Sequence, residues 1–354
     1  MIMVNLRPDS PRVSARRALM RKLVAPVVRS LPADRGMVAQ VAAAPDLRPE
    51  PLELPRWYEE NKALFAPPIC NKLMHKDQLT VMFVGGPNTR TDFHLDQGSE
   101  FFFQLQGNMC LPTIQKGKRK EVHIREGQVF LLPSRIPHSP QRPEEGALGL
   151  VVERRRDEGE VDGLRWYCDF DKCEEVLYER YFHCGDLGRD LVPVVKAFKE
   201  SEECATGKNK EGSVPTEKPF EIDLETEVPD PFKLDDFLEA HKVDLAAGSD
   251  LNLFEGHPDG EFSVRAIGGP SEQTASFEYE TFFFQLHGEI SICVAGREDE
   301  VVLADQGCFV VDANTKYTVK RKEGSIGLVV TQDPRGNREK PIGPGVAKRA
   351  KVVQ

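Results

Sequence analysis

The chain has 354 residues and a net charge of −10, and its 26 prolines and 28 glycines are spread among many short apolar runs. The length predicts two or three domains, and the short runs favour a β-rich fold over a helix bundle. The sequence holds no run of about 18 apolar residues, which argues against a membrane-spanning segment. The acidic balance argues against nucleic acid as a partner, because phosphate binding needs a positive surface. The eight cysteines are irregularly spaced, which predicts free thiols.

The N-terminal residues differ from the rest in charge. Residues 1–45 contain eight basic and two acidic side chains, a local balance of +6. An Arg-rich, acid-poor start is typical of an organelle transit peptide, a disordered arm or a mis-assigned start site. We therefore place residues 1–47 outside the folded domains as a basic extension. The expected location is cytoplasmic, with a mitochondrial location as the alternative if the extension is a transit peptide.

The first half of the folded chain predicts one helix followed by strands. Residues 52–65 have the pattern of a short amphipathic helix with Trp57, Leu64 and Phe65 on its buried face. Short apolar runs separated by turns then predict strands at 79–84, 101–105, 109–114, 121–124, 128–132 and 148–152. This spacing of short strands and turns indicates a β-sandwich or small β-barrel.

The spacing of the apolar residues then changes from that of strands to that of helices. Apolar residues recur at helical intervals over 164–203, which predicts two helices packed against the outside of the barrel. Residues 206–230 are rich in Lys, Glu, Pro and Gly and predict a linker. Residues 231–247 predict a further helix, and 254–331 a second set of short strands.

An internal repeat links the two sets of strands. Residues 100–107 (EFFFQLQG) return as 281–288 (TFFFQLHG), at an offset of 181. Two further segments return in the same order at offsets of 180 and 178, namely GQVFLL as GCFVVD and GALGLVVE as GSIGLVVT. Three ordered matches at nearly one spacing indicate two copies of one β fold.

The two copies differ at the residues that could carry chemistry. Counting by these offsets, the second copy has Ala, Thr, Thr, Ser, Lys and Thr at the positions that correspond to His94, Glu100, His138, Arg90, Arg142 and Glu153. The apolar strand residues persist while each candidate functional side chain is replaced. The second copy is therefore predicted to be a structural partner without a site of its own.

Two histidines and one glutamate of the first copy have the spacing of a metal site. His94 and Glu100 are six residues apart, so within a strand they share a face. His138 follows at the end of another hairpin. Two imidazoles and one carboxylate form the ligand set of non-haem Fe(II) oxygenases. A lone histidine at a strand end is more often a satisfied polar residue, but the selective loss of all three in the second copy favours the metal site.

Three further side chains could line the same pocket. Arg90 lies four residues before His94, and Arg142 four residues after His138. A guanidinium binds a carboxylate through two parallel hydrogen bonds. Glu153 ends an apolar run and could turn inward. The alternative is that the two arginines lie in solvated loops and that Glu153 opens a surface turn.

Two segments resemble the cupin motifs. The spacing Gly127-x5-Pro-x-Arg-x2-His138 is similar to the second motif, and His94-x-Asp-x3-Glu100-x6-Gly107 to the first. The usual first motif has a second histidine where Asp96 stands, and its absence fits a three-ligand site. More narrowly, 87–94 (PNTRTDFH), 130–142 (FLLPSRIPHSPQR) and 149–156 (GLVVERRR) resemble the 3-hydroxyanthranilate 3,4-dioxygenase family in its two-cupin animal form.

The resemblance implies an all-β-dominated bicupin, two small jelly-roll barrels in one chain with a few flanking helices. It implies one Fe(2+) per chain, a monomer, and conversion of 3-hydroxyanthranilate and O2 to 2-amino-3-carboxymuconate semialdehyde. This product is the precursor of quinolinate in NAD biosynthesis by the kynurenine pathway of tryptophan catabolism.

The patterns along the chain predict the domain division, and the resemblance implies a role for each site residue. The domains are an extension at 1–47, a catalytic cupin at 48–205, a linker at 206–230, a degenerate cupin at 231–335 and a basic tail at 336–354. The roles are iron ligation by His94, Glu100 and His138, substrate binding by Glu100, Arg142 and Glu153, dioxygen binding by Arg90, and acid–base catalysis by Glu153.

Two other functions remain open from the residues. Another cupin chemistry, such as an isomerase or a different aromatic dioxygenase, would keep the metal ligands without needing the two arginines and Glu153. A non-enzymatic binding or storage cupin would tolerate an empty pocket. Retention of the whole set in the first copy argues against the second alternative.

Overall fold

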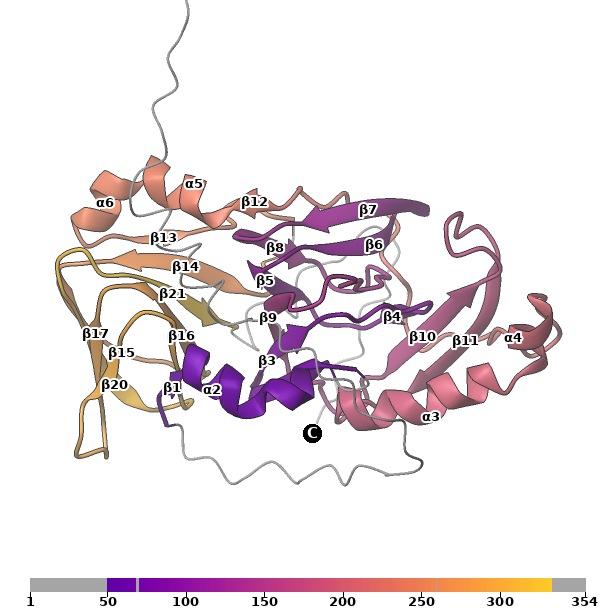
Figure 1. Ribbon diagram of the computed structural model, residues 1–354, viewed down its shortest axis with the longest axis horizontal. Coiled ribbons are helices and arrows are strands. Elements are labelled where there is room, and N and C mark those ends of the chain that lie inside the picture. Colours follow the sequence, from indigo (N-terminus) through magenta and orange to yellow (C-terminus); the bar gives the residue numbers. More distant parts are fainter. Residues whose placement is uncertain (1–49, 68–69, 259, 333–354) are drawn as a thin grey trace, which may run out of the picture.

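The computed structural model describes residues 50–67, 70–258 and 260–332, and strands make up most of its regular structure (Figure 1). The basic extension and the C-terminal tail, which were expected at 1–47 and 336–354, lie outside the described residues.

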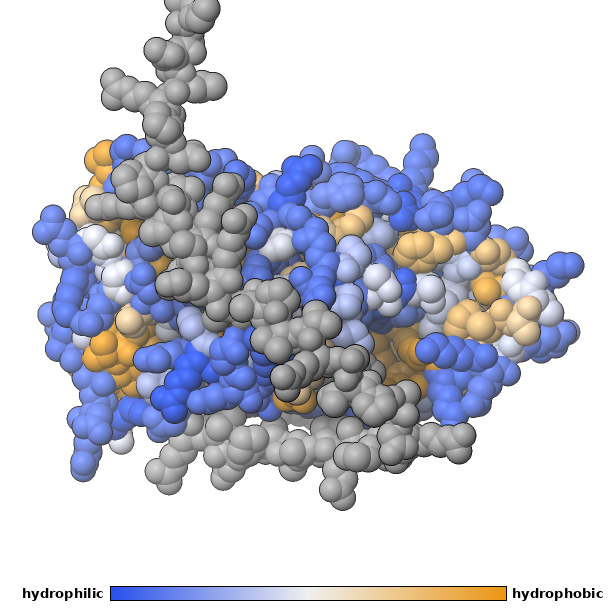
Figure 2. Space-filling model, viewed as in Figure 1, coloured by the Kyte–Doolittle hydropathy of each residue, from blue (hydrophilic) through white to orange (hydrophobic). Residues whose placement is uncertain are grey.

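Across the described chain, no helix is long and apolar enough to cross a membrane. All eight cysteines are free, as the sequence predicted. The face shown in Figure 2 is largely hydrophilic, with small apolar areas both near the end that carries β10 and β11 and at the opposite end.

Each copy of the repeat contributes a six-stranded antiparallel sheet. The first has the order β12-β8-β5-β9-β3-β2. Its strands are Phe232–Lys233, Gln128–Leu132, Glu100–Gln106, Leu148–Arg154, Leu79–Gly85 and Asn71–Lys76. The second has the order β1-β19-β16-β21-β14-β13. Its strands are Leu52–Glu53, Gly307–Val311, Thr281–His287, Ile326–Thr331, Ser263–Gly268 and Asp250–Asn252.

Smaller sheets face the large ones and close the two copies. In the first copy they are β6-β7 (Met109–Gln115, Lys118–Ile124) and β11-β10-β4 (Val176–Phe182, Asp162–Tyr167, Phe93–Leu95). In the second copy the sheet is β15-β20-β17-β18 (Ser271–Ser276, Lys316–Arg321, Ile290–Val294, Val301–Leu303). The expected strands of both copies are present, and the predicted bicupin fold with few helices is confirmed.

The two large sheets exchange their edge strands. β1 precedes the first copy in sequence but pairs with β19 of the second, with Leu52 opposite Cys308. β12 precedes the second copy but pairs with β8 of the first, with Phe232 opposite Val129. Each copy therefore completes its partner's sheet, and the division into separate domains at the expected boundaries stays a prediction.

Alternation along the strands decides which side chains face the site. Phe101 and Phe103 of β5 point into an apolar core shared by the two copies, where Phe103 packs against Phe284 with ring centroids 5.9 Å apart. Phe102 points the other way, into the interior of the first copy. Because side chains alternate with a period of two, Glu100 shares the inner face with Phe102. Each fully buried Phe contributes about 1.5–3 kcal/mol, so this register is strongly specified.

Helices cover the ends of the sheets. The expected helix at 52–65 is present as α2 (Leu54–Asn61) and the 3-10 helix η1 (Lys62–Phe65). Its buried residues are Leu54, Tyr58 and Phe65, whereas Trp57 and Leu64 are half-buried. The helix expected at 231–247 is present as α5 (Leu234–Ala240) and α6 (Lys242–Ala246).

The prediction of two helices over 164–203 is wrong in its first half. Residues 162–182 form the hairpin of β10 and β11, and only the second half is helical, as α3 (Leu187–Lys199) and α4 (Glu202–Thr206). β10 also pairs with β4, with Leu164 opposite His94. This long-range pairing overrides the local periodicity, because a strand in a sheet gains its stability from its neighbours.

The expected linker is irregular but packs on the first copy. The backbone N–H of Asp223 donates to the carbonyl of Arg135 at 2.9 Å. The N–H of Val228 donates to the side-chain oxygen of Gln115 at 3.0 Å, and Val228 is 2% exposed. The segment is therefore part of the wall of the first copy.

Candidate metal centre

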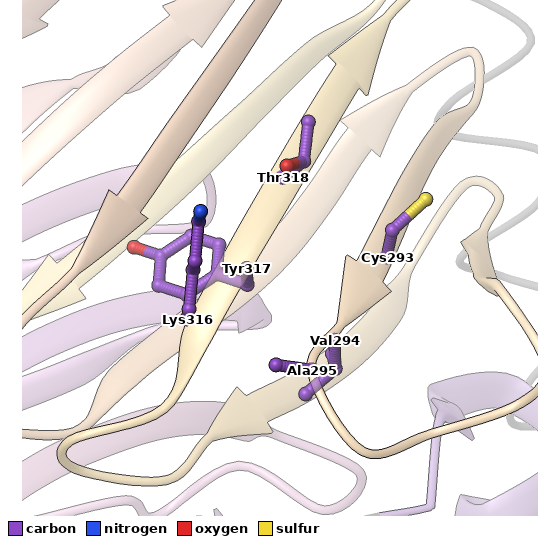
Figure 3. Close-up of a pocket in the computed structure, with 6 residues that line it drawn as sticks. All are labelled: Cys293, Val294, Ala295, Lys316, Tyr317 and Thr318. Carbon is purple, nitrogen blue, oxygen red and sulfur yellow. The ribbon is translucent and has the colours of Figure 1, made fainter.

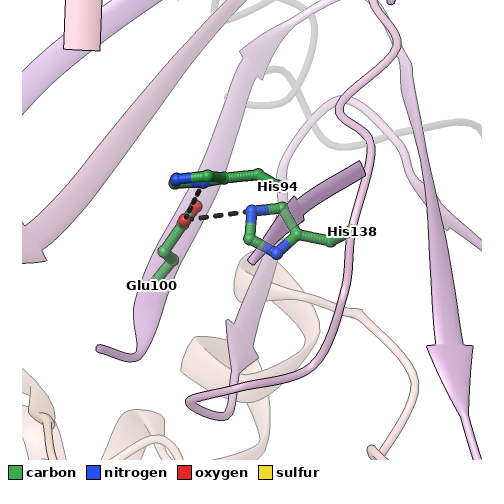
Figure 4. A group of neighbouring side chains, drawn as sticks. All are labelled: His94, Glu100 and His138. Atoms are coloured by element: carbon green, nitrogen blue, oxygen red, sulfur yellow. Dashed lines mark ion pairs between the residues drawn. The ribbon is translucent and has the colours of Figure 1, made fainter. Parts of the chain in front are cut away.

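Three buried side chains converge in the interior of the first copy. His94 lies in β4, Glu100 begins β5, and His138 lies in the irregular segment after β8. The backbones of the two histidines are paired, with N–H to carbonyl distances of 2.7 and 3.1 Å. One oxygen of Glu100 lies 3.1 Å from Nε2 of His138 and 3.8 Å from Nδ1 of His94. Figure 4 shows both rings turned toward this carboxylate, and the three form a group that could hold a metal ion.

In each histidine ring, the nitrogen that points away from Glu100 lies within hydrogen-bond distance of an oxygen atom. Nδ1 of His138 lies 3.0 Å from the carbonyl of Ile136, which can only accept, so this nitrogen carries a proton. Nε2 of His94 lies 2.7 Å from a carboxylate oxygen of Asp162. Outer partners of this kind fix the tautomer and orientation of metal-binding histidines. Each ring therefore directs its other nitrogen at the centre, where it could bind a metal ion once it carries no proton.

The charges at the centre favour a cation between His138 and Glu100. Burial alone would raise the pKa of Glu100, but the charges of His138 and His94 lower it to about 2. Burial alone would lower the pKa of His138, but the charge of Glu100 raises it to about 9. In the metal-free chain a proton thus supplies the positive charge between them. A divalent ion bound by the same atoms would replace that proton, so the donor set fits a metal.

Asp162 was not identified from the sequence. It begins β10, just before the residues 164–203 for which the sequence predicted helices. Its two oxygens accept from Nε and Nη2 of Arg156 at 3.1 and 2.9 Å, in addition to the contact with His94. Although burial opposes it, the hydrogen bond with His94 and the charge of Arg156 hold the pKa of Asp162 well below its usual range. No local pattern marks this residue, because its partner lies 68 positions away.

Glu153 lies directly opposite Glu100 in the pairing of β5 with β9. Both face the interior, and their carboxylates form a close group with Asp96. Burial, aided by the charge of Glu100, raises the pKa of Glu153 to about 7 against the opposing effect of Arg156, whose Nη1 donates to it. A carboxylate with a pKa near neutrality can both accept and release a proton.

Arg142 carries buried donors without partners. The residue is 2% exposed. Its Nε and Nη2 have no hydrogen-bond partner in the structure. Burial lowers the pKa of Arg142 to about 10. Gly149 lies against the guanidinium, since a Cβ built there would be in contact with Nη2 at 3.4 Å and would clash with Oε1 of Gln104 at 2.8 Å. Buried donors are nearly always satisfied, so this pair marks a place for an anionic ligand.

Arg90 differs from Arg142 in already having a carboxylate partner. Its Nε lies 3.1 Å from Oδ2 of Asp92, and its Nη2 contacts the same oxygen. The side chain of Gln141 holds its backbone through two hydrogen bonds of 2.9 Å. The structure thus places Arg90 beside the backbone of the segment that ends at Arg142. Asp92 was not singled out by the sequence.

The second copy keeps the framework without the ligands. Thr281 and Thr331 lie opposite each other in β16 and β21, as Glu100 and Glu153 do in the first copy. The offset count paired His94 with Ala275 and His138 with Thr318, but Ala275 lies opposite Tyr317. His94 and His138 pair with each other, so their counterparts should also pair. One of the two assignments is therefore wrong by one residue, because the connecting loops differ in length.

Tyr317 occupies the place that corresponds to a ligand. Its hydroxyl lies 3.4 Å from that of Thr281, much as His138 approaches Glu100. The shallow depression beside it is lined by Cys293, Val294, Ala295, Lys316, Tyr317 and Thr318 (Figure 3). This lining has neither an imidazole nor a carboxylate. Among the described residues, the three groups able to hold a metal all belong to the first copy.

Comparisons with known proteins agree with this picture. The model of the family described as 3-hydroxyanthranilic acid dioxygenase matches residues 47–199 and 230–343. The 3-hydroxyanthranilate 3,4-dioxygenase of Rattus norvegicus is 44% identical over 287 residues, which is 81% of this chain and 97% of that protein. The enzyme of the same name from Nematostella vectensis is 46% identical over 286 residues, covering 80% and 99%. The chain therefore belongs to the 3-hydroxyanthranilic acid dioxygenase family.

Proposed function

We propose that the chain is a ring-cleaving dioxygenase that converts 3-hydroxyanthranilate and O2 to 2-amino-3-carboxymuconate semialdehyde. Both oxygen atoms are incorporated, and the product closes to quinolinate with loss of water, which feeds NAD biosynthesis. Family membership supports the reaction. The buried Nε and Nη2 of Arg142, which lack hydrogen-bond partners in a side chain that feels the charge of Glu100, are the observation in the structure that carries it.

The proposed cofactor is one Fe(II) per chain, held by His94, Glu100 and His138. Two imidazole nitrogens and one carboxylate suit Fe(II) and leave coordination positions open. When bound, the iron supplies a centre at which O2 and an electron-rich ring meet. The chain's own contribution is to keep the ligands aimed, through Ile136 and Asp162, in a pocket from which water is largely excluded.

Arg142 is proposed to bind the carboxylate of the substrate. Its free Nε and Nη2 are adjacent donors of one fork, which is the geometry for two parallel bonds to a carboxylate. A charge-assisted hydrogen bond contributes about 1.5–3 kcal/mol. Because Arg142 is held rigidly in the wall, the bound carboxylate would fix the orientation of the ring.

The remaining site residues are proposed to act on protons and on oxygen. Glu153, with its raised pKa, would accept a proton from the substrate and return it later. Glu100 would contact the substrate as well as ligate iron, since it lies opposite Glu153 in the same pocket. Arg90 is proposed to face the bound dioxygen, while Asp92 holds its guanidinium in place.

The reaction can be tested by reconstituting the purified chain with Fe(II) without air and then adding 3-hydroxyanthranilate and O2. We expect a near-UV absorbance from the semialdehyde that decays to quinolinate, and no signal from metal-free protein. Metal analysis of the loaded protein should give one iron per chain. Verified iron-loaded protein that leaves this substrate unchanged would refute the proposed reaction.

A substrate analogue separates the role of Arg142 from that of the metal. 2-Aminophenol lacks the carboxylate but keeps the adjacent hydroxyl and amine. We expect Arg142→Ala to weaken binding of 3-hydroxyanthranilate by about 10- to 150-fold and to leave binding of 2-aminophenol nearly unchanged. Equal losses for both compounds would argue that Arg142 acts on the fold of the pocket and not on the carboxylate.

We further infer that the chain acts as a monomer, because the second copy already covers the apolar face of the first and completes its sheet. Light scattering of the purified chain would test this. For location we propose the cytoplasm, with the mitochondrion as the alternative. A fluorescent reporter fused after residues 1–47 would distinguish the two.

A further inference from the structure

One carboxylate of the second copy reaches the strands that present the site of the first. Glu261 precedes β14, and its Oε2 accepts from the backbone N–H of Ser99 at 2.7 Å. Ser99 is the residue before the ligand Glu100. The other oxygen of Glu261 accepts from Nε of Arg154, which is the residue after Glu153. A single side chain thus contacts the neighbours of both carboxylates that face the centre.

The guanidinium of Arg154 joins Glu261 to the loop between His94 and Glu100. Its Nη1 and Nη2 donate to the two oxygens of Glu160 at 2.6 and 3.0 Å, and Nη2 also donates to the carbonyl of Gln97 at 3.0 Å. The side chains of Arg154 and Glu261 are 9% and 12% exposed. Charge-assisted bonds in such a buried setting are short and directional, so the loop is held against β9.

In the pseudo-symmetric contact on the other side of the molecule a glutamine stands in the place of Glu261, although the buried carboxylate of Glu280 pairs with His75 nearby. There Gln78, which precedes β3, accepts from the backbone N–H of Glu280 at 2.8 Å. Its amide donates to the carbonyl of Gln332 at 2.8 Å and also contacts the side-chain oxygen of Gln332. Gln332 follows the last residue of β21 as Arg154 follows Glu153. The glutamate–arginine pair is therefore found on the side with the candidate ligands, and a glutamine–glutamine pair on the other.

We propose that Glu261 is a positioning residue for the metal centre, by which the second copy holds Glu100 and Glu153 in place for the ion. The proposal rests on the metal site proposed above. Glu261 faces two donors, the N–H of Ser99 and Nε of Arg154, so both of its oxygens must accept. A glutamine would point its NH2 at one of these donors and break that bond. Gln78 can be a glutamine because Gln332 offers it an acceptor.

Metal affinity measures this role without relying on turnover. The metal-free full-length chain is titrated with Co(II), whose visible absorption reports the ligand geometry, for the wild type, Glu261→Gln, Glu261→Ala and the matched control Gln78→Ala. Thermal unfolding of each variant is recorded alongside. Loss of an outer partner of a metal site typically costs about 10- to 100-fold in affinity. We expect this loss, with a changed spectrum, for both Glu261 variants.

The control decides between positioning and simple loosening of the interface. Gln78→Ala removes the counterpart contact and should lower the unfolding temperature while leaving the Co(II) affinity within about twofold of the wild type. Equal losses of affinity for Gln78→Ala and Glu261→Ala would overturn the proposal, and so would Glu261 variants with wild-type affinity and spectrum. A wild-type chain that binds no Co(II) would instead refute the metal site itself.

Discussion

His94 and Asp162 are joined by a hydrogen bond of 2.7 Å between Nε2 and Oδ2, although 68 residues separate them in the sequence. The contact arises because β10 pairs with β4, which carries His94. It leaves Nδ1 of His94 directed at Glu100. The hairpin of β10 and β11 thus orients one candidate ligand of the metal centre.

Asp162→Asn should weaken metal binding. The amide cannot accept with a full negative charge and can turn its NH2 toward the ring, so the preferred tautomer of His94 is lost. We expect affinity for Co(II) or Fe(II) to fall by about 10- to 100-fold, measured by titration of the metal-free chain. Asp171→Asn, at an exposed position on the same copy, serves as the control. Unchanged affinity for Asp162→Asn would show that Asp162 is not needed to hold the ring.

Arg142→Met should separate function from stability. Methionine has similar length and removes the buried donors that lack partners. Replacing an unsatisfied buried polar group by an apolar one is neutral or stabilising. We expect the unfolding temperature without substrate to stay level or rise, while the KM for 3-hydroxyanthranilate rises by about 10-fold or more. A clear fall in the unfolding temperature would mean that Arg142 has a structural partner.

Gly149→Ala should displace the side chain of Gln104, which lies beside Arg142. The added Cβ would lie 2.8 Å from Oε1 of Gln104 and 3.4 Å from Nη2 of Arg142. The matched control is Gly327→Ala in the second copy, where a Cβ would lie 2.7 Å from Oε1 of Gln285.

Both substitutions overpack the core and should destabilise the chain by about 1–3 kcal/mol. Only Gly149→Ala should also raise KM, because only there does the crowded side chain adjoin the proposed carboxylate site. Steady-state kinetics and denaturant unfolding of the two variants check this. A similar KM for both would argue against a role for the space at Gly149.

Glu153→Gln should change how stability depends on pH in the metal-free chain. Burial raises the folded-state pKa of Glu153 to about 7, above its unfolded value near 4.5. The folded state therefore holds a proton that the unfolded state releases, and stability falls as the pH rises from 4.5 to 7. The glutamine variant lacks this loss, so its stability relative to the wild type should be greater at pH 8 than at pH 5.

Denaturant unfolding at the two pH values measures the difference, with Glu158→Gln at an exposed position of the following turn as the control. A constant difference between wild type and Glu153→Gln across this range would show that Glu153 is charged throughout.

The sequence by itself determined the fold class and the identity of the site-bearing copy. Short apolar runs between turn residues predicted β3, β5, β6, β8 and β9 almost to their ends. The repeat predicted two copies, and the replacement of Glu100 and Glu153 by Thr281 and Thr331 identified the first as the functional one. The pairing of β16 with β21 preserves the same register in the second copy.

The tertiary structure decided which distant residues support the site. Residues 164–182 belong to the stretch with apolar residues at helical intervals but form strands, since pairing with β4 outweighs local preference. Asp162 contacts the candidate ligand His94 from β10, over 68 positions, and Glu261 of the second copy contacts Ser99, the neighbour of Glu100, over 162 positions. Such hydrogen bonds depend on where whole sheets pack, and no local pattern encodes them. The free donors of Arg142 became visible only once its surroundings were in place.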